Sequence, residues 1–262
     1  MNNYQAPTRY IGKNSKYLDI CPSTNSIAFE EALNGEIPEG FAWIAGHQTA
    51  GRGQRGNTWQ AEPHQNLTLS ILLRPSHALL EKQFFLSKAV ANGILDGLEA
   101  WSRATQGENF NFEIKWPNDI YLDGVKLGGI LIENNFQAGK WSFSIIGIGL
   151  NINQLNFEGI RGTSLRSYLE LKDPISLPEV YNYISQGIEN SYTLFKEGQF
   201  EKIDEHYHER LFRRLEWARY EAGNERFEGK ILGVNEQGLL EIEKEFTVES
   251  YDLKEISFIF PS

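Results

Sequence analysis

Leucine or isoleucine occupies every second position of the segment 67–73, LTLSILL. Successive side chains of a strand point to opposite faces, so this spacing predicts a β-strand. Short apolar runs predict further strands at 17–20, 41–46, 112–115, 120–122, 125–133 and 141–148. Because most of these strands follow one another directly, we expect a mixed, mostly antiparallel sheet.

Apolar residues recur at helical spacing in three other stretches. The first begins after the triplet STN at 23–25, residue types that favour helix N-caps, and runs to Leu33. The same three polar groups could instead face a ligand from the helix N-terminus. The second stretch spans 82–101 and precedes a polar segment, 102–109, that predicts a loop. The third stretch is 177–212.

Turn residues divide the strands between 112 and 150. Pro117 cannot donate to a ladder and predicts a break in its strand. Asp123-Gly124 predicts a type I′ hairpin. A further turn is predicted over 134–140.

The pattern changes from about residue 215. Short strands separated by glycine and asparagine are predicted at 218–220, 227–234, 239–243, 247–250 and 256–260. Regular short strands of this kind favour a small barrel. The predicted fold class is therefore α+β, with one domain over 1–214 and a small C-terminal β-barrel over 215–262.

Composition limits the partners of the chain. With 35 acidic and 25 basic residues its net charge is −10, which argues against non-specific binding to DNA or to an anionic membrane. A single cysteine excludes an intrachain disulfide and fits a reducing compartment. The N-terminus does not resemble a signal peptide, so we expect a cytoplasmic protein.

The segment 45–60, AGHQTAGRGQRGNTWQ, combines three closely spaced glycines with two arginines and a tryptophan. Glycines let the backbone approach a ligand, and arginines pair with carboxylate or phosphate. The segment contains G-x-G-x-x-G, but a strand follows it instead of a helix, which excludes a dinucleotide site. The alternative is a mobile hairpin loop whose arginines are solvated.

A second group of polar residues is KWPND at 115–119, followed by Lys126 and a double glycine at 128–129. Lysine can neutralise a phosphate, and the amide and carboxylate can hold a ribose, a base or a metal-bound water. The alternatives are a proline bulge with an exposed salt bridge and a solvated strand lysine. No nucleophile dyad and no zinc-ligand spacing is evident. The chemistry that these residues suggest is positioning of substrates and neutralisation of their charge, which adenylyl or phosphoryl transfer requires.

Taken in order, four motifs resemble those of biotin protein ligases: STN at 23–25, HQTAGRGQRGNTW at 47–59, KWPNDIYLDGVKLGGILIE at 115–133 and GIGLNIN at 147–153. The resemblance implies a class II synthetase-like catalytic domain and a small C-terminal SH3-like barrel. It implies that ATP activates biotin as biotinyl-5′-AMP, with Mg²⁺ accompanying ATP. The biotinyl group would then pass to a lysine of a biotin carboxyl carrier protein.

The resemblance also implies roles for individual residues. It assigns biotin contacts to Ser23, Thr24, Asn25, Gln48, Gly51, Arg52, Gly53, Gln54, Lys126, Gly128 and Gly129. It assigns ATP or adenylate contacts to Arg55, Gly56, Asn57, Trp59, Lys115, Asn118, Asp119 and Asn151. Lys126, Arg52 and Arg55 would be catalytic, and no metal is expected to be held by protein side chains.

Two departures from the family pattern qualify this assignment. Gln54 and Asn57 stand where many members have arginine, so the loop carries less charge for the phosphate of an adenylate. Only about twenty residues precede Ser23, too few for the DNA-binding domain of some members, and we predict no repressor function.

An exposed sheet edge could pair two subunits as a homodimer. The alternatives are a lipoate or octanoate transferase and a non-catalytic biotin-binding module.

Overall fold

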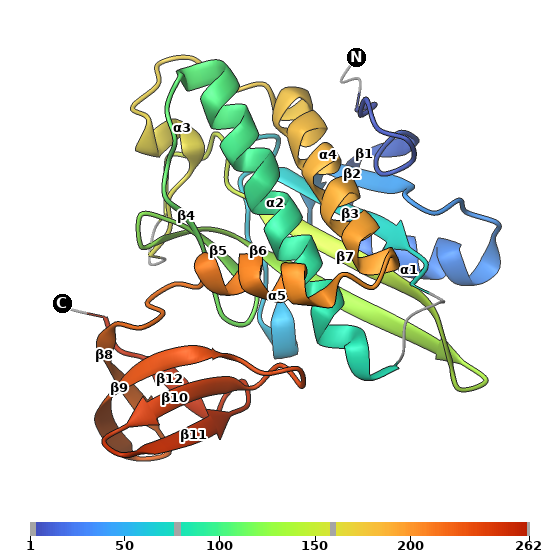
Figure 1. Ribbon diagram of the computed structural model, residues 1–262. Helices are drawn as coiled ribbons and strands as arrows, with labels where there is room; N and C mark the ends of the chain where they lie inside the picture. Colours follow the sequence, from blue (N-terminus) through green and yellow to red (C-terminus); the bar gives the residue numbers. More distant parts are fainter. Residues whose placement is uncertain (1–3, 76–79, 158–160, 261–262) are drawn as a thin grey trace.

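Two β-sheets and five α-helices form the molecule in a computed structural model that describes residues 4–75, 80–157 and 161–260. The larger sheet has seven strands in the order β1-β2-β3-β7-β6-β5-β4 (Figure 1). Their bounds are β1 Ser15–Cys21, β2 Ala42–Gln48, β3 Leu67–Leu73, β4 Phe112–Lys115, β5 Asp119–Leu122, β6 Val125–Gln137 and β7 Lys140–Leu150. Only the β1–β2 pair is parallel among these strands, which confirms the mixed, mostly antiparallel sheet.

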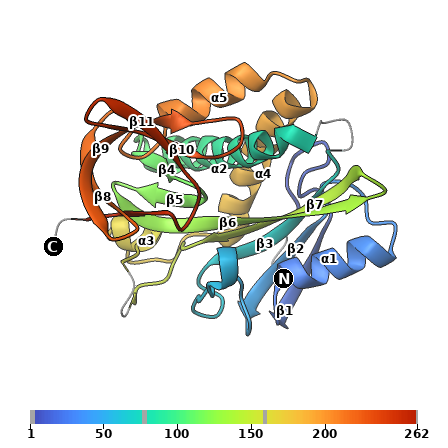
Figure 2. The same cartoon turned by 90° about the horizontal axis from the view of Figure 1, so that it is seen from below.

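Helix α1, Thr24–Asn34, joins the two parallel strands and lies on one face of the sheet, whereas α2 and α4 cover the other (Figure 2). The alternation in β3 follows from this arrangement. Leu69 and Ile71 join the core beneath α2, while Leu72 packs with Ala28 of α1. All seven residues of β3 are buried, because both faces of the strand are covered.

Helices α2, Gln83–Gln106, and α4, Leu177–Lys196, cross closely at glycines. A Cβ atom added at Gly187 would lie 2.1 Å from the carbonyl oxygen of Gly93. No side chain fits into that space, so glycine sets the distance between the helices.

Three boundaries differ from the prediction. The polar segment 102–109 is not all loop: α2 continues to Gln106 and ends at Gly107, whose φ is 71°. Its last turn is polar because it is mainly exposed, and exposure conceals the helical period. The helical stretch 177–212 is divided at Gly198, and α5 spans Phe200–Glu209.

The predicted turn over 134–140 is also shorter than expected. Strands β6 and β7 continue as a hairpin to Gln137 and Lys140, and the turn is Ala138-Gly139, both with positive φ. Polar residues pair as strands here because the ladder hydrogen bonds do not depend on side chains. Helix α3, Leu165–Tyr168, and the short 3₁₀ turns η1, Gln54–Gly56, and η2, Leu80–Lys82, were not predicted.

The C-terminal segment forms the second sheet, with all five strands predicted: β8 Trp217–Ala222, β9 Glu225–Val234, β10 Leu240–Lys244, β11 Thr247–Tyr251 and β12 Ile256–Phe258. It is antiparallel and curled, in the order β11-β10-β9-β8-β12 (Figure 1). Within the described residues its edge strands do not pair with each other, so the sheet is not a closed barrel. No helix in the described ranges has the length and apolar character to span a membrane.

Gly187→Ala should lower the free energy of unfolding by about 2 kcal/mol. A Cβ atom only 2.1 Å from a backbone oxygen puts the overpacking cost near the upper end of about 1–3 kcal/mol, and alanine regains about 1 kcal/mol in helix propensity. Urea unfolding measures the change. The control is Gln186→Ala on the exposed face of the same helix, expected within about 0.5 kcal/mol of the parent. Equal stability of the two variants would contradict the close crossing.

Candidate functional site

A cavity of about 380 Å³ opens where both sheets meet the start of α1 and the glycine-rich loop. It brings together most of the predicted site residues. Those that line it are Ser23, Thr24, Asn25, Gln48, Arg52, Gly53, Gln54, Asn57, Trp59, Lys115, Asn118, Asp119, Lys126 and Gly129.

The start of α1 forms one end of the cavity. Ser23 occupies the N-cap position, but among the described residues its side chain makes no capping hydrogen bond. Gln48, at the end of β2, does so instead: its Oε1 accepts from the backbone N–H of Thr24 at 2.7 Å and from Thr24 Oγ1 at 3.0 Å. The predicted capping triplet therefore forms a helix N-terminus whose polar groups face the cavity.

Asn25 is buried and held on every side. Its Nδ2 donates to Glu133 Oε2 at 2.8 Å and to the carbonyl of Leu131 at 3.2 Å. Ser70 Oγ donates to Asn25 Oδ1 at 2.5 Å. The protein satisfies most of the hydrogen-bonding capacity of this amide, so Asn25 shapes the wall.

Glu133 connects this network to the glycine-rich loop. Arg52 Nη2 lies 2.7 Å from Glu133 Oε2, and the arginine side chain is about half exposed. A half-exposed ion pair of this kind contributes little to stability and can exchange for another anion. Neither Ser70 nor Glu133 was predicted; both are strand residues outside the cavity lining that reach it through Asn25.

Two glycines of β7 make room for this arrangement. A Cβ atom at Gly147 would lie 2.3 Å from Asn25 Oδ1, and one at Gly149 would lie 2.5 Å from the Trp59 ring. The two positions are two residues apart, so they share one face of the strand. The sequence contains this pattern, GIGLN at 147–151, but its role depends on residues far away in the chain.

The second polar group lies across the cavity. The β4–β5 register places Lys115 opposite Asp119. Asp119 Oδ1 lies 2.6 Å from Lys126 Nζ, and its Oδ2 lies 3.7 Å from Lys115 Nζ. One carboxylate thus faces two ammonium groups, and the three charges sum to +1. Burial lowers the pKa of Lys115, while Asp119 favours its charged form.

The C-terminal sheet supplies a wall that was not predicted. Its residues in the lining are Leu253, Lys254, Ile256, Ser257, Phe258 and Phe260. Lys115 Nζ lies 4.7 Å from the centre of the Phe258 ring, a cation–π distance. These residues are more than a hundred positions away from KWPND, and no local pattern indicates the contact.

Four predicted residues do not line this cavity in the described part of the chain: Gly51, Gly56, Gly128 and Asn151. Gly51 and Gly128 are packing positions, since an added Cβ would lie 2.4 Å from the Trp59 carbonyl oxygen and 2.3 Å from that of Gly149, respectively. The backbone N–H of Asn151 donates to Leu127. The side chain of Arg55 lies outside the described residues. The ligand roles of these five residues, like those of the fourteen that line the cavity, stay predictions.

Asn118 lines the cavity, but its Nδ2 donates to the carbonyl of Ile130 at 2.7 Å. That bond ties KWPND to β6 and leaves the amide oxygen for other partners. Across the described ranges, no group of three or more His, Cys, Asp or Glu side chains could hold a metal ion.

Residues 17–151 match the family model of the biotin/lipoate A/B protein ligase family. This match covers more than half of the chain, which therefore belongs to that family. A bifunctional ligase/repressor BirA from Bacillus spizizenii is 29% identical over 90% of this chain and 71% of its own length. A biotin–[acetyl-CoA-carboxylase] ligase from Mycobacterium tuberculosis is 33% identical over 55% of this chain and 52% of its own.

Among solved structures, a mutant biotin protein ligase from Aquifex aeolicus in complex with biotin has a similar fold. The TM-score is 0.74 at 25% identity, over 94% of this chain and 98% of that one. The alignment therefore includes both sheets.

Gly147→Ala should destabilise the protein by about 1–3 kcal/mol, because Asn25 must move away from partners that satisfy its buried amide. Urea unfolding measures the change. Gly129→Ala is the matched control on the neighbouring strand, where the new Cβ would lie 3.5 Å from Asp119 Oδ1, an ordinary contact. If the two variants lose equal stability, Gly147 does not accommodate Asn25.

Proposed function

We propose that this chain is an ATP-dependent ligase that activates biotin as biotinyl-5′-AMP and transfers the biotinyl group to a lysine of a biotin carboxyl carrier protein. The observation on which this rests is the juxtaposition, in one cavity, of the Thr24–Gln48 end and the Lys115–Asp119–Lys126 cluster. The first suits a neutral polar ring, and the second suits an anion.

The polar end fits the ureido ring of biotin. That ring presents one carbonyl and two N–H groups, and Ser23, Thr24 and Gln48 offer hydroxyl and amide partners for both kinds. Neutral hydrogen bonds recognise such a ring without a charge that would need compensation. Biotin's carboxylate would then extend along the cavity toward Lys126.

The two lysines support the first chemical step. A carboxylate oxygen of biotin attacks the α-phosphorus of ATP, the bond to the bridging oxygen breaks, and pyrophosphate leaves. Negative charge increases on the α-phosphate oxygens in the transition state, where an ammonium group stabilises it. Asp119 orients Lys126 before substrates bind. Mg²⁺ accompanies ATP as the cation of its phosphates.

In the second step the neutral amine of a carrier lysine attacks the acyl carbon of the adenylate. A C–N bond forms, the bond to the phosphate oxygen breaks, and AMP leaves with release of a proton. The loop around Arg52 would cover the intermediate, exchanging Glu133 for the anionic ligand. Within this scheme we assign the chemistry to 1–214, and to 215–262 a share of the nucleotide wall.

The remaining assignments rest on charge and edges. The net charge of −10 supports a protein that does not bind DNA or anionic membranes, and the single cysteine supports a cytoplasmic location. Strand β1 is at the edge of the seven-stranded sheet, and Ile20 on it is 64% exposed. An edge strand with an exposed apolar side chain supports pairing of two copies into a homodimer.

Lipoate is the principal alternative substrate, because the family includes ligases for both acids. Titration calorimetry with biotin and with lipoate, each in the presence of a non-hydrolysable ATP analogue, separates the two. We expect biotin to bind and lipoate to give no measurable heat at the same concentrations. If lipoate binds and biotin does not, lipoate and not biotin is the substrate.

Lys126→Ala should reduce biotin-dependent pyrophosphate release by about a hundredfold or more, because the ammonium acts on charge that develops in the transition state. Biotin affinity should fall much less. The control is Lys140→Ala in the exposed β6–β7 hairpin, expected to match the parent. A variant with normal turnover at saturating substrates but lost biotin binding would contradict this role.

A further inference from the structure

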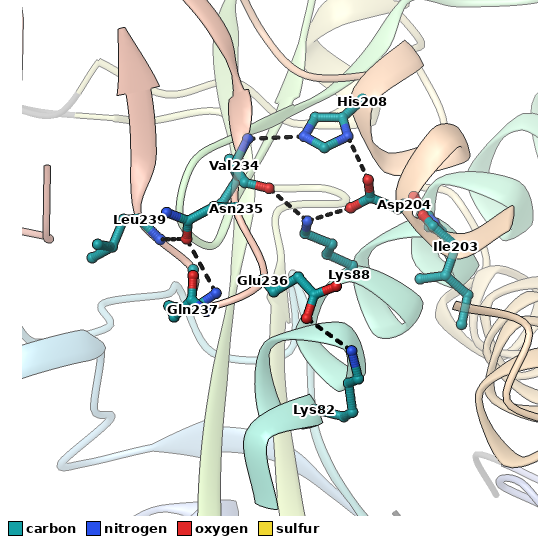
Figure 3. Close-up of polar contacts among 12 residues, drawn as sticks. Lys82, Lys88, Ile203, Asp204, His208, Val234, Asn235, Glu236, Gln237 and Leu239 are labelled. Carbon is teal, nitrogen blue, oxygen red and sulfur yellow. Dashed lines mark hydrogen bonds and ion pairs between the residues drawn. The ribbon is translucent and has the colours of Figure 1, made fainter. Parts of the chain in front are cut away.

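A buried lysine of α2 joins the C-terminal sheet to helices α2 and α5. Lys88 of α2 is fully buried, and its Nζ lies 2.5 Å from Asp204 Oδ1 of α5 and donates to the carbonyl of Val234 at 2.8 Å (Figure 3). Removing an ammonium group from water is costly unless it is paired and hydrogen-bonded. The centres of the Phe84, Phe85 and Tyr207 rings also lie 5.3–5.4 Å from Nζ. The Asp204 carboxylate and the Val234 carbonyl are therefore the hydrogen-bond acceptors that hold this charge.

His208 of α5 fixes the same residue from its other side. Its Nε2 accepts from the backbone N–H of Val234 at 2.8 Å, while its Nδ1 faces Asp204 Oδ2 at 3.2 Å (Figure 3). An accepting Nε2 requires a neutral ring, and burial lowers the pKa of His208, which favours that form. Both polar backbone groups of Val234 are thus held by side chains of two helices.

Val234 is the last residue of β9, and hydrogen bonds close the turn after it. The side-chain oxygen of Asn235 accepts from the backbone N–H groups of Gln237 and Leu239, at 3.1 and 3.0 Å (Figure 3). An asparagine that closes two hydrogen bonds within its own turn restricts the turn to one conformation. The cluster at Val234, together with the Phe84 ring of α2 against which Gly238 packs, therefore places the carbonyl of Gly238.

This carbonyl contacts the candidate site. It accepts from Trp116 Nε1 at 2.9 Å, and Trp116 is a buried member of KWPND that lines the cavity of the candidate site. The β9–β10 turn and Pro117-Asn118 also share the wall of an adjoining cavity of about 720 Å³. A chain of direct contacts thus runs from Lys88 through the turn to the nucleotide side of the site.

We propose that Lys88, Asp204 and His208 form a positioning cluster that holds the β9–β10 turn and, through Gly238, the Trp116 indole at the ATP side of the site. The inference rests on the proposed function for its kinetic consequence. Lys88 lines neither the cavity of the candidate site nor the adjoining one, so it is a positioning residue. The cluster acts on ATP selectively because its contacts lead to KWPND and not to the Thr24–Gln48 end.

Lys88→Met, which keeps the length and apolar character of the side chain, tests the proposal in the full chain. The KM for ATP in biotin-dependent pyrophosphate exchange should rise by roughly ten- to a hundredfold, the range that small displacements of binding groups produce. Biotin affinity without ATP should stay at the parent value. The control is Lys82→Met, which removes an ion pair of 2.8 Å to Glu236 on the same turn but no bond to its backbone. This control should match the parent.

A double variant distinguishes positioning from general destabilisation. Trp116→Phe removes the indole N–H that donates to the carbonyl of Gly238. If the cluster acts through this bond, Lys88→Met in the Trp116→Phe background should add little to the KM for ATP. Three results would each overturn the proposal. The two substitutions could multiply in their effects on the KM for ATP, Lys88→Met could weaken biotin binding and ATP binding equally, or Lys88→Met could behave like Lys82→Met.

Amide exchange supplies a readout that is independent of activity. Segments 115–119 and 235–239 should exchange faster in Lys88→Met than in Lys82→Met, even if the parent protein releases no pyrophosphate. Faster exchange in a protein that releases no pyrophosphate would reject the proposed function and support the positioning cluster. Unchanged exchange would reject the positioning cluster. If Lys88→Met does not fold, His208→Phe removes the acceptor for Val234 and serves the same three measurements.

Discussion

The site depends on two positions of β7 that carry no side chain. Gly147 and Gly149 leave the space over the sheet that Asn25 and the Trp59 ring occupy. Asn25 in turn binds Glu133, and Glu133 holds Arg52. A methyl group at Gly147 would displace Asn25, the first member of this series, and one at Gly149 would displace the Trp59 ring. The order of the cavity therefore begins with backbone that can be approached closely, and the polar network is built on it.

The cationic side chains of the same site are each paired with a carboxylate. Lys126 and Lys115 share the carboxylate of Asp119, and Arg52 pairs with Glu133. Each cation is thereby held in place by a carboxylate that an anionic substrate can replace. Such preorganisation limits the rearrangement needed when an anionic substrate enters, which is the condition for effective electrostatic stabilisation.

Local patterns in the chain predict most of the elements and much of the site. The alternation of LTLSILL, the Asp123-Gly124 turn and the five short C-terminal strands depend on neighbours in sequence, and the structure contains all of them. Boundaries were less accurate where exposure removed the apolar period, as at the end of α2. The family motifs identified Lys126, Asp119 and Gln48 for the cavity, because these residues lie within single motifs.

Contacts between distant segments could not be predicted in this way. Ser70 and Glu133 look like ordinary strand residues until the sheet order places them beside Asn25. Phe258 and Gly238 meet KWPND only because the C-terminal sheet packs against it. Lys88 has no local sign of its role, since a lysine within a helix is ordinarily exposed.

Pyrophosphate release by the purified chain is the most direct measurement of biotin activation. We expect release when biotin and ATP are both present, and none when either is left out or when lipoate replaces biotin. A folded protein that releases no pyrophosphate with biotin and ATP would contradict that expectation.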